Sequence, residues 1–398
     1  MPKALYPCVC LCDWWRPVTY RARLIIYAML APLAILVFLP GVGAFCFQHF
    51  GWWVCVLLRT FFFSFFLCPV VEHFGIRFKF LDYPERRKIH QEPIPRIGGL
   101  AIYLSLVLVS LRYIPMHHDL LALLIGSSII FFTGMVDDMR SISSIYRLTA
   151  QVCAAGVLIF SGLTIDFVPH IMGEHIIEII ITFIWIIGIT NAVNFLDGIN
   201  GLVSGMGALC GLMFLILSWN LRQNSVVLVT VALAGGCLGF IPYNYKFWLK
   251  DRRASLFLGD EGSTLIGFLL AGIAVKGTWA EANPVVALST PLLILGIPIF
   301  DMIYTTISRI KNNKVHNIRE WLDYVGKDHF HHRLMNLGFG PKSAVLFVFV
   351  LNICLGLSAL IIPRADFISA ILLLIQAVIV FLIIVVLMLL GRKQHPAE

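Results

Sequence analysis

Charged residues are scarce in this sequence: only 13% of its 398 residues are Asp, Glu, Lys or Arg, whereas 59% are hydrophobic. Soluble chains carry roughly a quarter charged residues, so the composition excludes a soluble globular protein. No polar stretch is long enough to fold as a separate soluble domain. Most of the chain must therefore contact lipid or other apolar helices. We expect an all-α fold, a polytopic membrane helical bundle.

Cysteine pairs with metal-binding spacing are also missing. Most of the ten cysteines lie in apolar runs, where Cys behaves as a small hydrophobic residue. Cys8, Cys10 and Cys12 lie close together before the first apolar segment, but no second ligand pair lies nearby. This argues against a metal or redox centre in the N-terminal tail, which we interpret as a reduced cytosolic segment.

Apolar windows long enough to cross a bilayer, roughly 17–25 residues each, recur between residues 24 and 390. Their number predicts about 11–12 transmembrane helices. The first window, 24–46, follows three arginines and is long for a cleaved signal sequence, so an uncleaved anchor is favoured. We divide the chain into a tail with an extra apolar segment (1–50) and a single transmembrane domain (51–398).

The positions of Lys and Arg predict the orientation of the chain in the membrane. Most of the 30 basic residues fall in segments that share one side if the predicted helices alternate. We therefore expect both termini to be cytoplasmic. Because the net charge of +8 is carried by loops between spans, it favours contacts with membrane lipids and phosphates rather than nucleic acid. The sequence shows no inverted repeat of the kind found in many transporters.

Unusual polar residues gather on this predicted cytoplasmic side, at the ends of separate apolar windows. In sequence order they are Asp137, Asp138, Asn194, Asp197, Asn244, Asp260, His329, His331, His332 and Arg333. Carboxylates near bilayer depth are costly and usually functional. Taken singly, each residue also fits a helix cap, a turn or a solvated helix end. Their convergence from separate segments predicts one site.

Oxygen ligands without cysteine indicate Mg²⁺, or alternatively Mn²⁺, rather than zinc. Asp260 with one of the other aspartates suits a Mg²⁺ that also binds substrate phosphates. The histidine segment could itself bind a metal, but Arg333 favours an anion there, because a guanidinium pairs with phosphate oxygens. Lys88 and His90, in the loop 82–96, are further candidates for substrate binding; anchoring of lipid headgroups is an equally good interpretation for them.

Five separated blocks then show a family resemblance: DYPERRKIHQEPIPRIGG, GMVDDMRS, NAVNFLDGINGL, PYN with FLGDEGS, and DHFHHRL. Between Asp82 and Arg333 the chain resembles the polyprenyl-phosphate N-acetylhexosamine-1-phosphate transferases of glycosyltransferase family 4. The resemblance implies transfer of a sugar 1-phosphate, first of all GlcNAc-1-phosphate, from a UDP-N-acetyl sugar to undecaprenyl phosphate, with release of UMP. It also implies a bacterial inner membrane and a product that initiates a cell-surface polysaccharide, of O-antigen or teichoic-acid type. A homodimer is compatible with it.

The resemblance also implies roles for individual residues. It makes Asp137, Asp138 and Asp197 catalytic and Asp260 the Mg²⁺ ligand. Besides Lys88 and His90, proposed above from the loop itself, the residues that the resemblance assigns to substrate binding are Asn194, Asn244, Phe257, His329, His331, His332 and Arg333. Phe257 falls where the family places an aromatic ring against uracil. Asn200 departs from the pattern, since many relatives have an aspartate there.

Several alternatives stay open at this point. A related transferase could use another UDP-N-acetyl sugar, and the attack could be direct or pass through an aspartate-bound phosphosugar. An ion-coupled transporter would need acidic residues near the middle of the bilayer in broken helices, whereas these lie at helix ends. A non-catalytic scaffold would not need the aspartates. Asp301 fits either a polar packing contact or support for the site.

Overall fold

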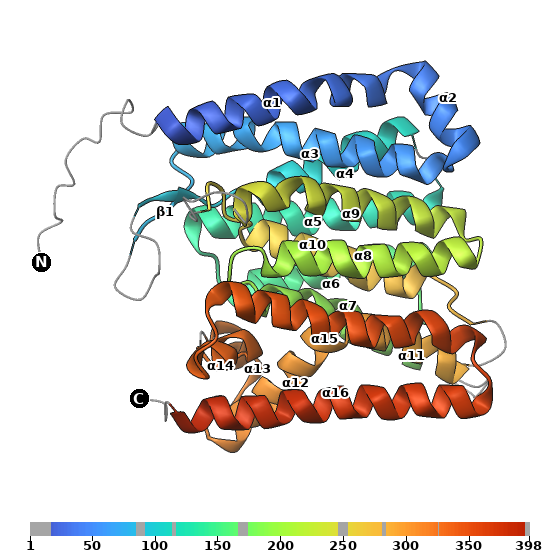
Figure 1. Cartoon of the computed structure of the whole chain (residues 1–398). Coiled ribbons are helices and arrows are strands. Elements are labelled where there is room, and N and C mark those ends of the chain that lie inside the picture. Colours follow the sequence, from blue (N-terminus) through green and yellow to red (C-terminus); the bar gives the residue numbers. More distant parts are fainter. Residues whose placement is uncertain are drawn as a thin grey trace, which may run out of the picture.

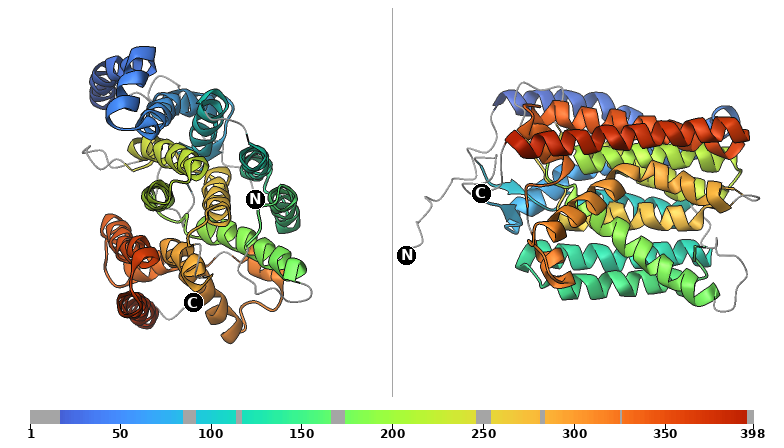
Figure 2. Two further views of the ribbon diagram at one scale, coloured as in Figure 1. Left: turned by 90° about the vertical axis from the view of Figure 1, so that its right-hand side faces the viewer. Right: turned by 90° about the horizontal axis from the view of Figure 1, so that it is seen from below.

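The computed structural model describes residues 17–84, 92–113, 117–165, 174–245, 254–280, 284–324 and 326–394. Most of this part of the chain is helical, and the long helices run side by side (Figures 1 and 2). The first half contains α1 (Pro17–Phe38), α2 (Pro40–His49), α3 (Trp52–Arg77), β1 (Leu81–Asp82), β2 (Ile94–Pro95), α4 (Gly99–Tyr113), α5 (His118–Arg140), α6 (Ser144–Phe160) and α7 (Glu174–Phe195).

The second half continues the bundle and adds two short helices in the longest loop. Its elements are α8 (Leu202–Asn220), α9 (Asn224–Asn244), α10 (Asp260–Lys276), α11 (Pro284–Ile294), α12 (Gly296–Lys311), α13 (Ile318–Asp323), α14 (Phe330–Asn336), α15 (Pro341–Ile361), the 3₁₀ turn η1 (Ile362–Arg364) and α16 (Phe367–Gln394). The predicted all-α membrane bundle is therefore confirmed, and the chain is a multi-pass membrane protein.

Among the described residues, seven helices are long and apolar enough to span a bilayer by themselves: α3, α5, α7, α8, α9, α15 and α16. The pair α11 and α12 counts as an eighth if it is one broken span, and α1, α4 and α6 contain shorter apolar helices. Each predicted window falls on one of these helices, on α10 or on a helix pair. The window 24–46 covers two helices rather than one, and so does the apolar segment from 285 to 308.

The second of these pairs bends by 80° between α11 and α12. Pro298 lies in the first turn of α12, and a proline has no N–H to donate to the carbonyl of Ile294 four residues earlier. The helical hydrogen-bond pattern is therefore interrupted where the chain turns. The hydropathy of this segment does not show the bend.

Helix α10 lies inside the bundle, packed against α7, α5, α4 and α8. Its middle residues, such as Leu265, Ile266 and Phe268, have no exposed surface. A Cβ atom at Gly134 of α5 would lie 2.5 Å from the Cα of Glu261, so the backbones of α5 and α10 touch there. This close approach brings the end of α5, with its two aspartates, onto the start of α10.

A two-stranded hairpin marks one end of the bundle, called the hairpin end below. Strands β1 and β2 pair antiparallel, and the amide of Phe257 donates to the carbonyl of Pro95 at 2.8 Å. The amide of Gly98 donates in turn to the carbonyl of Phe257 at 2.8 Å. Helix α1 begins and α16 ends at this same end, beside α13 and α14 (Figure 1). The segment before α10 is thus fastened to the chain around Arg96.

The extra N-terminal segment packs along α3 as helices α1 and α2. Near the hairpin end, the hydroxyl of Tyr243 on α9 donates to the hydroxyl of Tyr27 on α1 at 2.9 Å. Farther along, the guanidinium Nε of Arg59 donates to the carbonyl of Val37 at 3.3 Å. These contacts join α1 to both α3 and α9.

Candidate functional site

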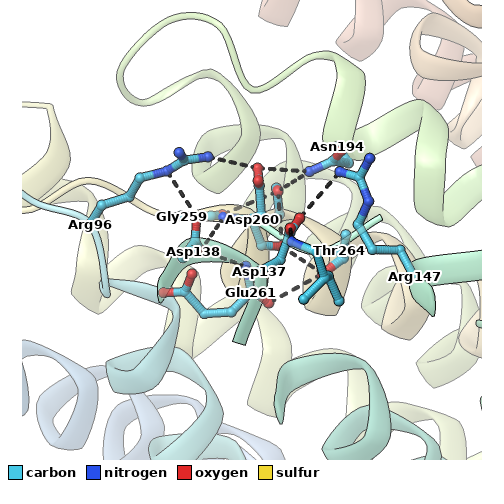
Figure 3. A network of polar contacts seen from close by, with 11 residues as sticks. Arg96, Asp137, Asp138, Arg147, Asn194, Gly259, Asp260, Glu261 and Thr264 are labelled. Atoms are coloured by element: carbon cyan, nitrogen blue, oxygen red, sulfur yellow. Dashed lines mark hydrogen bonds and ion pairs between the residues drawn. The ribbon is translucent and has the colours of Figure 1, made fainter. Parts of the chain in front are cut away.

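The start of α10 is the centre of the candidate site (Figure 3). Oδ2 of Asp138 accepts the backbone N–H groups of Asp260 at 2.7 Å and of Glu261 at 3.2 Å. The first N–H groups of a helix lack partners within it and carry positive partial charge. The carboxylate of Asp138, on α5, therefore caps α10 and holds the backbone of Asp260 in place. The Asp138 side chain is 3% exposed.

Arg96 bridges the two aspartates. Its Nε lies 3.1 Å from Oδ1 of Asp138, and its Nη2 lies 2.8 Å from Oδ1 of Asp260. Although burial opposes its charge, the neighbouring carboxylates of Asp260 and Asp138 raise the pKa of Arg96. Arg96 thus stays cationic and offsets the repulsion between the two carboxylates.

Residues at the end of α7 approach Asp260 from another side. The amide Nδ2 of Asn194 donates to Oδ1 of Asp260 at 3.3 Å and to the hydroxyl of Ser263 at 2.8 Å. Asp197 follows in the turn after α7, where its N–H donates to the carbonyl of Asn194 at 3.0 Å. Burial, and next the negative charge of Asp260, raise the pKa of Asp197 to about 7. Asp197 is therefore close enough to Asp260 for the two charges to repel.

Asp137 faces away from its neighbour Asp138. Its Oδ2 lies 3.2 Å from Nη1 of Arg147, and its Oδ1 accepts the N–H of Ile142 at 2.8 Å. Figure 3 shows Arg147 and Arg96 on opposite sides of the acidic cluster. The two adjacent aspartates thus serve different flanks of one site.

A pocket opens on the Arg147 flank, between α5, α6, α7 and the start of α10. It contains about 520 Å³ of empty space, part of it open to solvent. Asp137, Asp260 and Arg147 line it, together with apolar residues such as Ile130 and Leu148. The pocket therefore offers charge and an apolar wall side by side.

Asn244 and Phe257 lie near each other at the end of α9 and before α10. Oδ1 of Asn244 accepts the N–H of Gly201 at 2.5 Å, and its Nδ2 donates to the carbonyl of Leu256 at 3.1 Å. The amide of Asn244 is therefore occupied by backbone groups and holds two loops together. Phe257 is half-buried and pairs through its backbone with Arg96.

The three histidines have different surroundings. His329 is buried, with Nδ1 2.7 Å from Oδ2 of Asp301 and Nε2 3.0 Å from Nη2 of Arg309. His331 is 1% exposed, and neither of its ring nitrogens has a hydrogen-bond partner in the described structure. Its Nε2 lies against Gly198, where a Cβ atom would meet it at 2.3 Å. His331 thus reaches the turn that carries Asp197.

His332 and Arg333 complete this segment and are half-buried. Burial lowers the pKa of His331 well below its usual range. Burial and the nearby His329 lower the pKa of His332 to about 4. Both imidazoles are therefore neutral at physiological pH. Nε of Arg333 donates to the carbonyl of Asp328 at 3.4 Å.

The structure brings most of the predicted site residues to the hairpin end, in an aspartate group around α10 and a histidine group around α14. Lys88 and His90 lie in 85–91, outside the described residues.

Sequence reasoning missed Arg96, Arg147 and Glu261. Arg96 lies within the first resemblance block, and a search for the cation that balances the aspartates could have found it. Arg147, by contrast, lies in no block.

A cation would find oxygen ligands here but no complete protein cage. The described residues contain no group of three His, Cys, Asp or Glu side chains spaced to hold a metal. Mg²⁺ usually takes only one or two carboxylates and completes its shell with water and substrate phosphates. The carboxylate of Asp260 offers oxygen ligands, and the amide of Asn194 lies beside it. These groups fit Mg²⁺ and do not fit a structural zinc site, which is built from Cys and His.

The sequence similarity between this chain and known proteins extends over a region much longer than the site. A family model described as glycosyl transferase family 4 matches residues 120–278. The chain is 28% identical over 305 residues to a probable undecaprenyl-phosphate N-acetylglucosaminyl 1-phosphate transferase of Bacillus subtilis (strain 168), covering 75% of this chain and 82% of the relative.

Two other relatives have similar names. The chain is 29% identical over 318 residues to a decaprenyl-phosphate N-acetylglucosaminephosphotransferase of Mycolicibacterium smegmatis, covering 72% of this chain and 76% of the relative. It is 28% identical over 304 residues to an undecaprenyl-phosphate alpha-N-acetylglucosaminyl 1-phosphate transferase of Escherichia coli (strain K12), covering 74% and 78%. Fold, site and relatives together define a multi-pass membrane transferase. Residues 120–278 match the model of glycosyl transferase family 4, the family that the sequence blocks predicted, and the similarity to these relatives extends over about three quarters of the chain.

Proposed function

We propose that the protein transfers N-acetylhexosamine 1-phosphate, first of all GlcNAc-1-phosphate, from a UDP-sugar to undecaprenyl phosphate. An oxygen of the lipid phosphate attacks the β-phosphorus of the sugar nucleotide. The bond between the α- and β-phosphates breaks and UMP leaves, so one phosphoanhydride replaces another. The names of the three relatives support the reaction class, and the geometry around α10 supports a site for phosphates.

The observation that carries the proposal is the position of Asp260. It lies at the N-terminus of α10, an end that attracts anions, between the cationic Arg96 and the amide of Asn194. Phosphoryl transfer depends mainly on positioning and on offsetting charge. Mg²⁺ bound at Asp260, or Mn²⁺ in its place, would offset the charge of the diphosphate. Arg96 would hold the carboxylates in place around it.

The two flanks of the cluster suit the two substrates. The turn with Asp197, against which His331 lies, belongs to the side where we propose that the UDP-sugar binds. The pocket beside Arg147 pairs Arg147 and Asp137 with apolar walls. A lipid phosphate needs this combination, because its head is anionic while its chain is apolar. We propose that undecaprenyl phosphate enters there from between α5, α6 and α7.

We also propose in which membrane the protein lies and what its product initiates. Basic residues concentrate in the loops of the hairpin end, which by the positive-inside rule faces the cytoplasm. Both termini would then be cytoplasmic, and the membrane would be a bacterial inner membrane. There the lipid-linked product would initiate a cell-surface polysaccharide of O-antigen or teichoic-acid type.

UMP release from purified, detergent-solubilised protein tests the proposal. The reaction contains undecaprenyl phosphate, Mg²⁺ and one of a panel of UDP-N-acetyl sugars. We expect release with UDP-GlcNAc that requires the lipid and disappears with a chelator. If no donor reacts while a family relative works in parallel, the proposed reaction is wrong. If another sugar alone reacts, the donor assignment is wrong.

A further inference from the structure

Four polar residues, three of them buried, contact one another at the start of the histidine segment. Asp301 and Arg309 lie on α12 two turns apart, and each side chain is about 1% exposed. Asp328 and His329 come from the loop before α14. Nε and Nη2 of Arg309 donate to the two carboxylate oxygens of Asp328 at 2.9 and 2.7 Å. Charged residues buried in a membrane protein are costly and usually serve function.

The contacts of His329 determine which of its nitrogens carries the proton. Arginine is always a donor, and Nη2 of Arg309 lies 3.0 Å from Nε2 of His329. Nε2 must therefore accept, and the single ring proton is on Nδ1. That proton points at Oδ2 of Asp301, 2.7 Å away. Both nitrogens of His329 are thus used inside the protein, and neither is left to bind a phosphate.

Asp301 also accepts a hydrogen bond from Phe330, the residue that follows His329. Its Oδ1 accepts the backbone N–H of Phe330 at 2.7 Å, in the first turn of α14. One carboxylate on α12 therefore fixes both the ring of His329 and the start of the short helix that carries His331. His331 follows two residues later, and its ring stacks parallel to that of His329 with 6.0 Å between centroids. The position of His331 against Gly198 depends on this attachment.

We propose that Asp301 and Arg309 are positioning residues, which act through His329 to hold α14 and His331 against the turn of Asp197. His329 then has a structural role, and His331 and His332 are the histidines left to meet the donor. The effect on catalysis rests on the proposed function, but the arrangement of the protons does not.

Steady-state kinetics of Asp301→Asn, His329→Gln and the double variant test the catalytic part. The His329 and Phe330 protons go to different oxygens of Asp301, and in asparagine one of these acceptors is replaced by an NH₂ group that can only donate. We expect the KM for the UDP-sugar to rise about tenfold or more, since a charge-assisted hydrogen bond is lost. The KM for the lipid should change less, because neither altered residue lines the lipid pocket and His329 contacts it only through the ring of Phe195. The double variant should be no worse than the poorer single variant, because both changes interrupt one chain of contacts.

Glu178→Gln is the matched control. Oε2 of Glu178 lies 3.3 Å from Nδ1 of His175 on α7, a carboxylate–histidine contact at the opposite end of the bundle. This variant should keep both KM values. Losses that multiply in the double variant, or an unchanged donor KM in Asp301→Asn, would overturn the positioning role.

A spectroscopic measurement keeps the inference testable if the Asp301 variants fail to fold. In NMR spectra of protein with isotope-labelled histidine nitrogens, the His329 signals are those missing from His329→Gln. We expect the Nδ1–H tautomer, and the Nε2–H tautomer would contradict the proposal. This result does not depend on turnover. An inactive wild-type protein with the expected tautomer would therefore refute the proposed function and leave the buried arrangement intact.

Discussion

The cap on α10 gives the sharpest prediction about the aspartates. Asp138→Asn preserves the shape of the side chain but removes its charge. One oxygen can still accept an N–H group of α10, yet the new NH₂ group must then face Nε of Arg96, which is itself a donor at 3.1 Å from the present Oδ1. We expect Arg96 to turn away from this position and Asp260 to lose its fixed orientation.

The size of the effect follows from the contacts that change. Asp138 is almost fully buried and accepts two backbone N–H groups besides the ion pair. Hydrogen bonds to charged groups contribute about 1.5–3 kcal/mol, and about 1.4 kcal/mol corresponds to a factor of ten in rate. If this loss appears in the transition state, kcat/KM should fall roughly 10- to 100-fold.

UMP release with both substrates varied measures this loss. The control is Asp119→Asn, because Asp119 joins the other end of α5 to α10 through an ion pair with Lys276. It should lower the melting temperature and leave kcat/KM unchanged. Turnover of Asp138→Asn within about threefold of wild type would show that the cap does not position Asp260.

Four further outcomes follow from the same geometry. Asp260→Asn should reduce turnover at least about 100-fold at every Mg²⁺ concentration in a UMP-release titration. Because the pKa of Asp197 is raised to about 7, the folded protein holds a proton that the unfolded chain releases, so its stability should fall as pH rises toward 7. Thermal unfolding of Asp197→Asn should lack that slope. Arg147→Gln should raise the KM for the lipid more than that for the sugar nucleotide, as initial rates would show. Tyr27→Phe removes the acceptor of the Tyr243 hydroxyl and should cost about 1 kcal/mol in denaturant unfolding while kcat stays unchanged.

Much of the architecture could be predicted from the sequence, because bilayer-spanning helices need long apolar runs. Every predicted window contains helix, whereas the bend between α11 and α12 was not foreseen. A hydropathy pattern records how apolar a segment is and not the direction of its axis. Pro298 was the available local sign, since a proline interrupts helical hydrogen bonding.

The candidate site could be predicted as a set of residues but not as an arrangement. Motif blocks indicated Asp137 and Asp138 as a pair, whereas the structure turns them to opposite flanks. Successive residues on a helix point about 100° apart, and contacts between distant segments decide what each one meets. The same reason hid Arg96, whose two partners lie on α5 and α10. The pairing of His329 with Asp301 likewise depends on how the loop folds back onto α12.

The fate of the β-phosphate distinguishes transfer of a sugar 1-phosphate from transfer of the sugar alone. Purified protein would receive undecaprenyl phosphate, Mg²⁺ and UDP-GlcNAc labelled with radioactive phosphorus in the β position, and the products would be separated by organic extraction. Transfer of the sugar 1-phosphate predicts that the label moves into the lipid phase while unlabelled UMP accumulates in water. Labelled UDP in the aqueous phase would show transfer of the sugar alone and would contradict the account.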